Sequence, residues 1–166
     1  LTAAKAGSGV NFNTYLTAQF KGFTPYQMPF FLEQNGSTET TQILHLDTPV
    51  AGREANTRVV LLEGDDFLYT FSNHTVSGTI DTIRLGTLGN AWDASASDLA
   101  LTNGLVTNMA SVVTISGLNI TNAAGVAGDV HEIVAGMMGG GPSGTDADAD
   151  PILDAIWSAA HNVTGT

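Results

Sequence analysis

The chain of 166 residues contains 43% hydrophobic residues, 19 glycines and no cysteine, and its 16 acidic and 5 basic residues give a net charge of −11. This length and hydrophobic content predict a single domain, residues 1–166, with a real core and many turns. The absence of cysteine excludes disulfides, thiolate zinc sites and a covalently attached c-type haem. The acidic balance argues against nucleic acid or an anionic membrane surface as a partner.

Two further classes are disfavoured by the sequence. No stretch reaches the ~18 consecutive apolar residues of a membrane-spanning helix, so we expect no membrane insertion. A nucleophile elbow, a phosphate-binding loop and a two-histidine zinc motif are all missing, so we expect a protein that is not an enzyme. The chain begins at Leu1-Thr2 without methionine or a signal peptide, and we expect a processed product or a module of something longer.

The first predicted element is an amphipathic helix. Phe12, Leu16 and Phe20 recur at every fourth position, and Gly22 and Pro25 follow as a stop. The next segment, residues 23–31, is too interrupted by proline for a strand and unusually aromatic for a loop. It is interpreted either as a loop folded over the core or as one wall of an apolar pocket.

From Thr41 the hydrophobic period changes to two, which predicts strands bounded by Gly, Pro, Asn or Asp. The predicted strands cover residues 43–46, 58–62, 66–71, 75–85 and 112–118. Short strands in uninterrupted succession favour antiparallel pairing. Residues 86–111 remain ambiguous, with Trp92 as an apolar anchor.

Helical periodicity returns late in the chain. Apolar residues at 130, 133, 134, 137 and 138 form a stripe, which the glycines from Gly139 onward end. Asp150 and Pro151 open a last helix, whose stripe is Ile152, Ile156, Trp157 and Ala160. The fold class predicted is α+β, a single curved antiparallel β-sheet with helices packed on one face.

The hairpin at residues 64–84 carries the most specific pattern. Tyr69 precedes His74 by five residues across a tight turn, and strand alternation places Phe67, Tyr69 and Phe71 on one face. A phenol becomes a good metal ligand once it loses its proton, which in water needs pH near ~10, and a nearby histidine can share that proton. The alternative is an ordinary hairpin with a core aromatic and a surface histidine.

The residues around this hairpin resemble the HasA-type haemophores, small haem-capturing proteins secreted by Gram-negative bacteria. The resemblance rests on three blocks in the right order, although the turn is shorter here. The matching residues are Val10, Asn11, Phe12, Tyr15, Leu16 and Phe23; then Gly64, Leu68, Tyr69, Thr70, His74, Thr75, Gly78, Asp81 and Ile83; then Gly117, Leu118, Asn119, Val130, His131, Val134, Gly136 and Met138.

This resemblance implies a site for ferric haem b. Tyr69 would be the axial iron ligand and His74 its hydrogen-bonded partner, since tyrosinate is among the protein ligands that hold haem iron. Met138 matches a methionine that contacts haem in the family, although its helical stripe fits core packing equally well. Tyr26, Met28 and Phe30 are the expected pocket residues of the loop.

Many family members supply a second axial ligand, a histidine, from the loop after the first helix. Here the corresponding position is Met28, and no histidine lies between Leu1 and Leu44. Three alternatives remain: Tyr69 alone binds iron, Met28 adds its thioether, or His45 reaches the iron. We favour Tyr69 alone, with Met28 lining the pocket.

Other candidate ligands are weaker. His131 matches the family in type, but a lone helical histidine is usually a packed or surface residue, and His161 has no matching motif. Carboxylates alternate over residues 146–150 as in calcium loops, but the central glycine and the distal glutamate are missing.

The resemblance implies an extracellular protein, secreted by a Gram-negative bacterium, that takes haem from haemoproteins and delivers it to an outer-membrane receptor. The alternative is a non-enzymatic module of a larger secreted adhesin that keeps the fold without binding haem.

Overall fold

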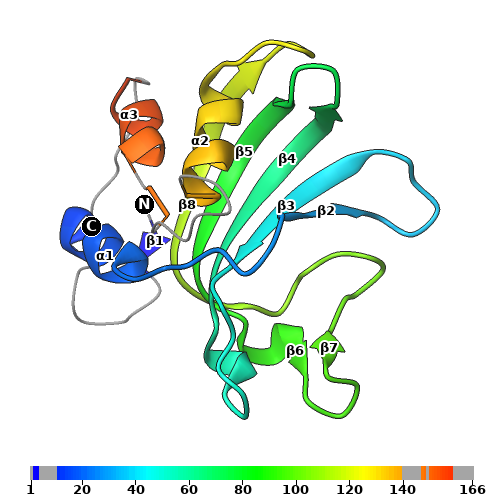
Figure 1. The fold of residues 1–166 in the computed structure, drawn as a ribbon, viewed down its shortest axis with the longest axis vertical. Coiled ribbons are helices and arrows are strands. Elements are labelled where there is room, and N and C mark those ends of the chain that lie inside the picture. The colour runs from blue at the N-terminus through cyan, green and yellow to red at the C-terminus, as the bar shows by residue number, and fades with distance from the viewer. Residues whose placement is uncertain (1, 4–10, 140–146, 149, 159–166) are drawn as a thin grey trace.

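One main antiparallel sheet, a small two-stranded sheet and three α-helices make up the computed structural model of the chain, which describes residues 2–3, 11–139, 147–148 and 150–158. The sheet has six strands in the order β1–β8–β5–β4–β3–β2, and Figure 1 shows it curving beside the helices. The strands are β1 (Thr2–Ala3), β2 (Phe30–Glu33), β3 (Thr40–Leu46), β4 (Arg58–Thr70), β5 (Thr75–Thr87) and β8 (Ala110–Asn122). The helices are α1 (Phe12–Phe20), α2 (Asp129–Met137) and α3 (Asp150–Ser158). Among the described residues, no helix has the length and apolarity that crossing a membrane requires.

All three helices pack on the same face of the sheet, as predicted. Their buried side chains form the helix-side core with alternate residues of the central strands. Its members include Leu16 of α1, Ile133 and Met137 of α2, Ile152 of α3, and Ile43, Val60, Leu62, Ile83 and Ile115 of the sheet. The predicted α+β class, with helices on one face, is therefore confirmed.

The opposite face is covered by the connection between β5 and β8, which the sequence left ambiguous. This segment contains the short hairpin of β6 (Trp92–Asp93) and β7 (Asp98–Leu99) and a 3₁₀ turn, η2 (Gly89–Ala91). Its Leu88, Ala91, Val106 and Met109 pack on Leu44, Val59 and Leu61 of the sheet. The amide of buried Gln42 fixes the segment, because it donates to the Val106 carbonyl (3.0 Å) and accepts from the Val106 N–H (2.9 Å).

The predicted strands 58–62 and 66–71 are a single strand, β4, and the break expected at residues 63–65 was wrong. The residues there form bulges, with register shifts between Glu63 and Gly64 and between Asp65 and Leu68. Asp66 adopts φ 55°, and a Cβ on Gly64 would lie 1.8 Å from the Thr79 carbonyl oxygen. Bulges bend a strand without ending it, so β4 curves around the helices.

The expectation that residues 23–31 contain no strand was wrong at their end. Phe30 and Phe31 open β2, the edge strand that pairs with β3. Proline is tolerated directly before an edge strand because no ladder partner needs its missing N–H, and Pro29 occupies that place. Gly139 ends α2 as expected, with φ 66° after the C-cap residue Met138.

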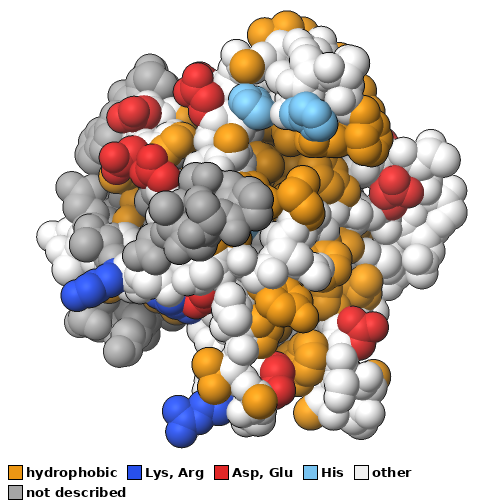
Figure 2. All heavy atoms as spheres, in the orientation of Figure 1, with side chains coloured by type: hydrophobic (Ala, Val, Ile, Leu, Met, Phe, Trp, Pro, Cys, Tyr) orange, Lys and Arg blue, Asp and Glu red, His pale blue; other side chains and the backbone are white. Residues whose placement is uncertain are grey.

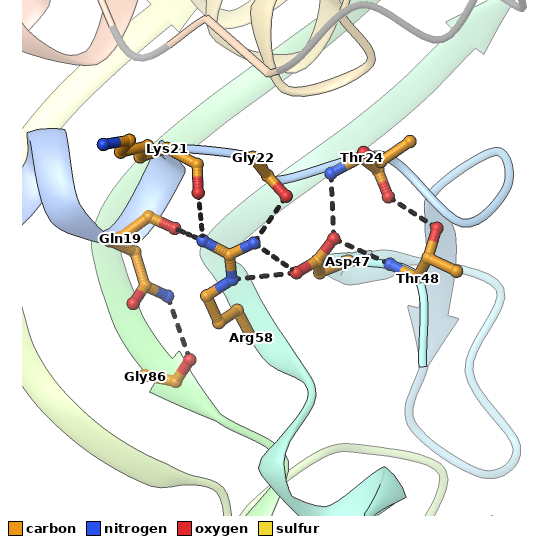
Figure 3. Close-up of polar contacts among 8 residues, drawn as sticks. All are labelled: Gln19, Lys21, Gly22, Thr24, Asp47, Thr48, Arg58 and Gly86. Atoms are coloured by element: carbon orange, nitrogen blue, oxygen red, sulfur yellow. Dashed lines mark hydrogen bonds and ion pairs between the residues drawn. The ribbon is translucent and has the colours of Figure 1, made fainter. Parts of the chain in front are cut away.

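Arg58 joins the C-terminal end of α1 to the sheet (Figure 3). Its guanidinium donates to the carbonyls of Gln19 (2.7 Å), Lys21 (2.8 Å) and Gly22 (2.6 Å). It also forms an ion pair with Asp47, with 2.8 Å from Nε to Oδ2. Gln19 lies in the last turn of α1, where carbonyls lack a partner within the helix, and Lys21 and Gly22 follow that turn. One side chain therefore ties the helix end and the start of the loop to the sheet.

Asp47 extends the same network to the start of the loop that follows α1. Its Oδ1 accepts from the N–H groups of Thr24 and Thr48, each at 2.8 Å (Figure 3). The Thr48 hydroxyl donates to the Thr24 carbonyl at 2.9 Å. The first residues of the loop that carries Met28 are therefore fixed to both β3 and β4.

Candidate haem-binding site

Tyr69 lies near the end of β4, where its ring packs against the helix-side core. Two aromatic rings meet it edge-on: Phe31 at 6.5 Å and 63°, and Phe71 at 4.9 Å and 89° between ring planes. Phe67 is buried in the same core, as strand alternation predicted. Phe71, however, follows the end of β4 and is 80% exposed, so it covers the outer side of the Tyr69 ring.

His74 is the hydrogen-bond partner of Tyr69. The phenol oxygen lies 2.6 Å from His74 Nδ1, at the short end of the usual range for hydrogen bonds. A phenol donates its proton across this distance, and a phenolate accepts one. The pair forms because Thr70 and Thr75 close the hairpin in register, while His74 adopts φ 57° and turns its ring back over β4.

The turn itself is anchored to the start of α2. The Asn73 amide donates to the Gly125 carbonyl at 2.7 Å, and its oxygen accepts from the Thr75 hydroxyl at 2.9 Å. Asn122 then orients the helix, since its Oδ1 accepts from the Val130 N–H (3.0 Å) within the first turn of α2. Side-chain oxygens in this position satisfy N–H groups that the helix leaves free.

A pocket of about 290 Å³ opens in front of Tyr69. Its walls come from the loop before β2, from the β4–β5 hairpin and from α2. Among the described residues that line it, all but three titratable side chains are apolar or contribute backbone, and none is Lys, Arg, Asp or Glu. The lining residues are Met28, Pro29, Phe31, Tyr69, His74, Val76, His131, Val134, Ala135, Met138 and Gly139. Figure 2 shows histidine side chains at the rim of an apolar depression beside α2.

Four of the six predicted site residues meet here: Tyr69, His74, Met28 and Met138. Met28 lines the pocket from the loop and is 59% exposed.

Tyr26 and Phe30 do not line the Tyr69 pocket; they line a different pocket on the other side of the loop and β2. Strand alternation explains this separation. Phe30 pairs with Leu44 and faces the connection side, whereas Phe31 pairs with Ile43 and faces the helix side. Phe31 is therefore the pocket residue that the sequence prediction missed.

His45 is too far away to be an iron ligand beside Tyr69. It pairs with Val60 on β4, nine residues before Tyr69, which at about 3.3 Å per residue is on the order of 30 Å. Its side chain is buried in the interior, and its Nε2 has no hydrogen-bond partner. Burial lowers the pKa of His45 to about 3, so it is neutral under ordinary conditions.

His131 also lines the pocket, although the sequence analysis interpreted it as a packed or surface residue. Its Nδ1 accepts from the Val76 N–H at 3.3 Å, which fixes the neutral ring with its proton on Nε2. A sequence signal was present: residues 131, 135 and 138 follow i, i+4, i+7, one position after the core stripe of α2. His161 and Asp146 lie outside the described residues, and within the described part no three His, Asp or Glu residues gather as a metal site.

Comparison with known proteins agrees with this geometry. A family model described as Heme-binding protein A (HasA) matches residues 35–166, and this confirms the resemblance inferred from the sequence. No curated protein matches the chain. Among solved structures, the apo haemophore HasA from Yersinia pestis is similar at 24% identity and a TM-score of 0.57, covering 88% of this chain and 78% of its own. The holo form from the same organism is similar at 22% identity and a TM-score of 0.56, covering 88% and 80%.

Proposed function

Since the chain belongs to the Heme-binding protein A (HasA) family of secreted haem-binding haemophores, we propose that it binds one ferric haem b through the phenol oxygen of Tyr69. The observation that carries this proposal is the 2.6 Å contact between Tyr69 and His74 at the mouth of an apolar pocket. HasA haemophores are carriers, so we assign the chain a transport role and no catalytic one.

The donor set fits ferric haem. Iron(III) is a hard cation that favours an anionic oxygen, and tyrosinate holds haem in other proteins. His74 can take or share the phenol proton, which keeps the oxygen anionic and orients the ring. Phe31 and Phe71 hold that ring from two sides, so the ligand atom is positioned before haem arrives.

The pocket walls fit a flat apolar ligand that is only partly enclosed. A volume of about 290 Å³ is at the lower end of the ~300–1,000 Å³ of ligand pockets. One edge of the haem would therefore stay at the surface, beside the exposed side chains of Met28 and Phe71. An exposed edge suits a carrier that must release its cargo.

We further propose that Tyr69 is the sole axial ligand from the protein. His45 is about nine strand residues away, and the Met28 thioether is a soft donor that matches ferric iron poorly. His131 engages its Nδ1 with the backbone of β5. The iron would then be five-coordinate, or six-coordinate with water, and largely high-spin.

The same proposal extends to transfer. The chain would be secreted by a Gram-negative bacterium, take haem from haemoproteins and pass it to an outer-membrane receptor. Family membership supports this route, and so does the exposed apolar edge of the pocket, because a second protein can reach a haem that is held there.

Titration with hemin tests the proposal. Wild-type protein should bind hemin about one to one, with a strong visible spectrum. Tyr69→Phe removes only the phenol oxygen and keeps the ring contacts, so it should lose most of the bound haem. Tyr26→Phe is the matched control, because its phenol lies outside the pocket, and it should bind normally. Undiminished haem binding by Tyr69→Phe would refute the assignment.

A further inference from the structure

A second pocket, of about 420 Å³, lies on the other side of β2, between the loop after α1 and the β6–β7 hairpin. Three aromatic side chains line it: Tyr26, Phe30 and Trp92. Tyr26 is 53% exposed and Trp92 half-buried, so ring surface is open to a ligand. Figure 2 shows apolar side chains gathered on this lower part of the face, with acidic ones beside them. We call this the aromatic pocket.

The charged side chains that line the aromatic pocket in the described part of the chain are the carboxylates of Glu54 and Asp98. Asp93 pairs with Asp98 across β6 and β7 but does not line the pocket, and its Oδ1 accepts from the Ser95 N–H and hydroxyl. Backbone N–H groups of Glu54 and Gly52 hold the pKa of Glu54 below its usual value, so this carboxylate remains ionised.

We propose that the aromatic pocket binds a small organic cation with an apolar body, such as a quaternary ammonium. The faces of aromatic rings attract a cation, and the carboxylates of Glu54 and Asp98 attract it as well. A pocket of this size with apolar walls and a few convergent polar groups is typical of small-molecule sites. An anionic ligand would be repelled, and a neutral one would lose both electrostatic contributions.

Two isosteric probes separate charge from shape: choline and 3,3-dimethylbutan-1-ol, which carries carbon in place of the quaternary nitrogen. Each is titrated into haem-free protein while backbone amide shifts are followed by NMR. Choline should give a saturable shift centred on residues 26–30, 51–54 and 97–99. The neutral probe should bind at least about fivefold more weakly, the effect of losing a cation–π contact. No saturable shift with choline, or equal binding of both probes, would overturn the proposal.

Two double variants test whether the carboxylates of the aromatic pocket are responsible for choline binding. The double variant Glu54→Gln, Asp98→Asn keeps the side-chain shapes and removes two charges, so it should weaken choline binding several-fold. Glu132→Gln, Asp154→Asn removes the same charge from exposed positions on α2 and α3 and should bind choline as the wild type does. Equal weakening by both double variants would mean that only net charge acts, and the site assignment would be wrong. The absence of haem keeps this result independent of the Tyr69 proposal.

Discussion

Tyr69 and His74 are joined by a short hydrogen bond at the edge of the molecule, and the side chains around them decide how the two rings are held. The phenol ring is fixed by Phe31 and Phe71, whereas the His74 ring is exposed and depends on its backbone conformation. With φ 57°, position 74 lies in the left-handed region, which asparagine tolerates better than most residues. His74→Asn therefore removes the titrating ring with little backbone strain.

His74→Asn should retain haem at neutral pH and release it earlier on acidification. A hydrogen bond to a charged group contributes about 1.5 to 3 kcal/mol, so the midpoint of acid release should rise by about one pH unit. Absorbance of the holoprotein during a pH titration measures this shift, with the wild type as reference. Complete loss of haem at every pH, as expected for Tyr69→Phe, would show that His74 does more than support the phenolate.

Met28 provides a test of coordination number. Leucine roughly conserves its volume and apolarity, so Met28→Leu should leave the ferric visible spectrum nearly unchanged and high-spin. Met28→His should create a low-spin, six-coordinate species if the loop reaches the iron. A wild-type spectrum that is already low-spin, and turns high-spin in Met28→Leu, would identify Met28 as a true ligand.

At the scale of elements, the loop after α1 is held at its base and free at its tip. Arg58 and Asp47 fix its first residues through six hydrogen bonds and an ion pair, drawn in Figure 3, that join α1, β3 and β4. Tyr26 and Met28 beyond this network are more than half exposed. The network determines where the loop leaves α1, and the exposed side chains of Tyr26 and Met28 are available to contact ligands.

Arg58→Lys should destabilise the fold by about 2 kcal/mol, because the lysine ammonium cannot reproduce the planar guanidinium, which donates hydrogen bonds to three carbonyls and a carboxylate. Arg84→Lys is the control: within the described part of the chain Arg84 pairs with Glu63 alone, at 2.7 Å and with a third of its side chain exposed, and such pairs contribute about 1 kcal/mol or less. Urea unfolding followed by circular dichroism measures both. Equal losses in the two variants would contradict the role given to Arg58.

Local periodicity predicted those elements whose signal lies within a few residues. Spacing of four placed α1 and α2, and alternation placed Phe67 and Tyr69 on the helix side. Features that depend on distant partners were not predictable: the bulge at Asp66 and the contact of Gln42 with Val106, which are 64 positions apart. For the site, Tyr69 and His74 are close in sequence, so their contact across the turn was predictable, while their roles toward haem stay a prediction. Phe31 was missed because its direction depends on pairing with Ile43 of β3.

At the scale of the whole molecule, the sheet separates two hydrophobic cores in the part of the chain that the structure describes, and His45 is buried in this sheet. His45 faces the helix side within an apolar strand, and its Nε2 lacks a partner. Because burial lowers the pKa of His45 from 6.5 to about 3, the unfolded chain binds a proton there that the folded chain does not. Folding is therefore opposed by acid below pH 6.5, and this contribution vanishes above it.

The free energy of unfolding should fall by about 2 kcal/mol from this group alone between pH 7 and pH 5. His45→Leu should flatten this part of the pH profile and should be at least as stable as the wild type at pH 7, because it removes an unsatisfied polar atom. Urea unfolding of the haem-free protein at several pH values measures the slope. A slope unchanged in His45→Leu would refute the assignment.

The two pockets lie on opposite sides of β2 and of the loop that precedes it, so a single layer of chain separates them. In this layer Tyr26 and Phe30 line the aromatic pocket, while Met28 and Phe31 line the Tyr69 pocket. A ligand that displaces this layer from one side changes the volume of the pocket on the other side. Thermodynamic reciprocity then sets the relation: the factor by which choline changes the affinity for hemin equals the factor by which hemin changes the affinity for choline. A small cation taken up from the surrounding solution by the aromatic pocket would thus change how tightly the protein holds haem on the other side of β2.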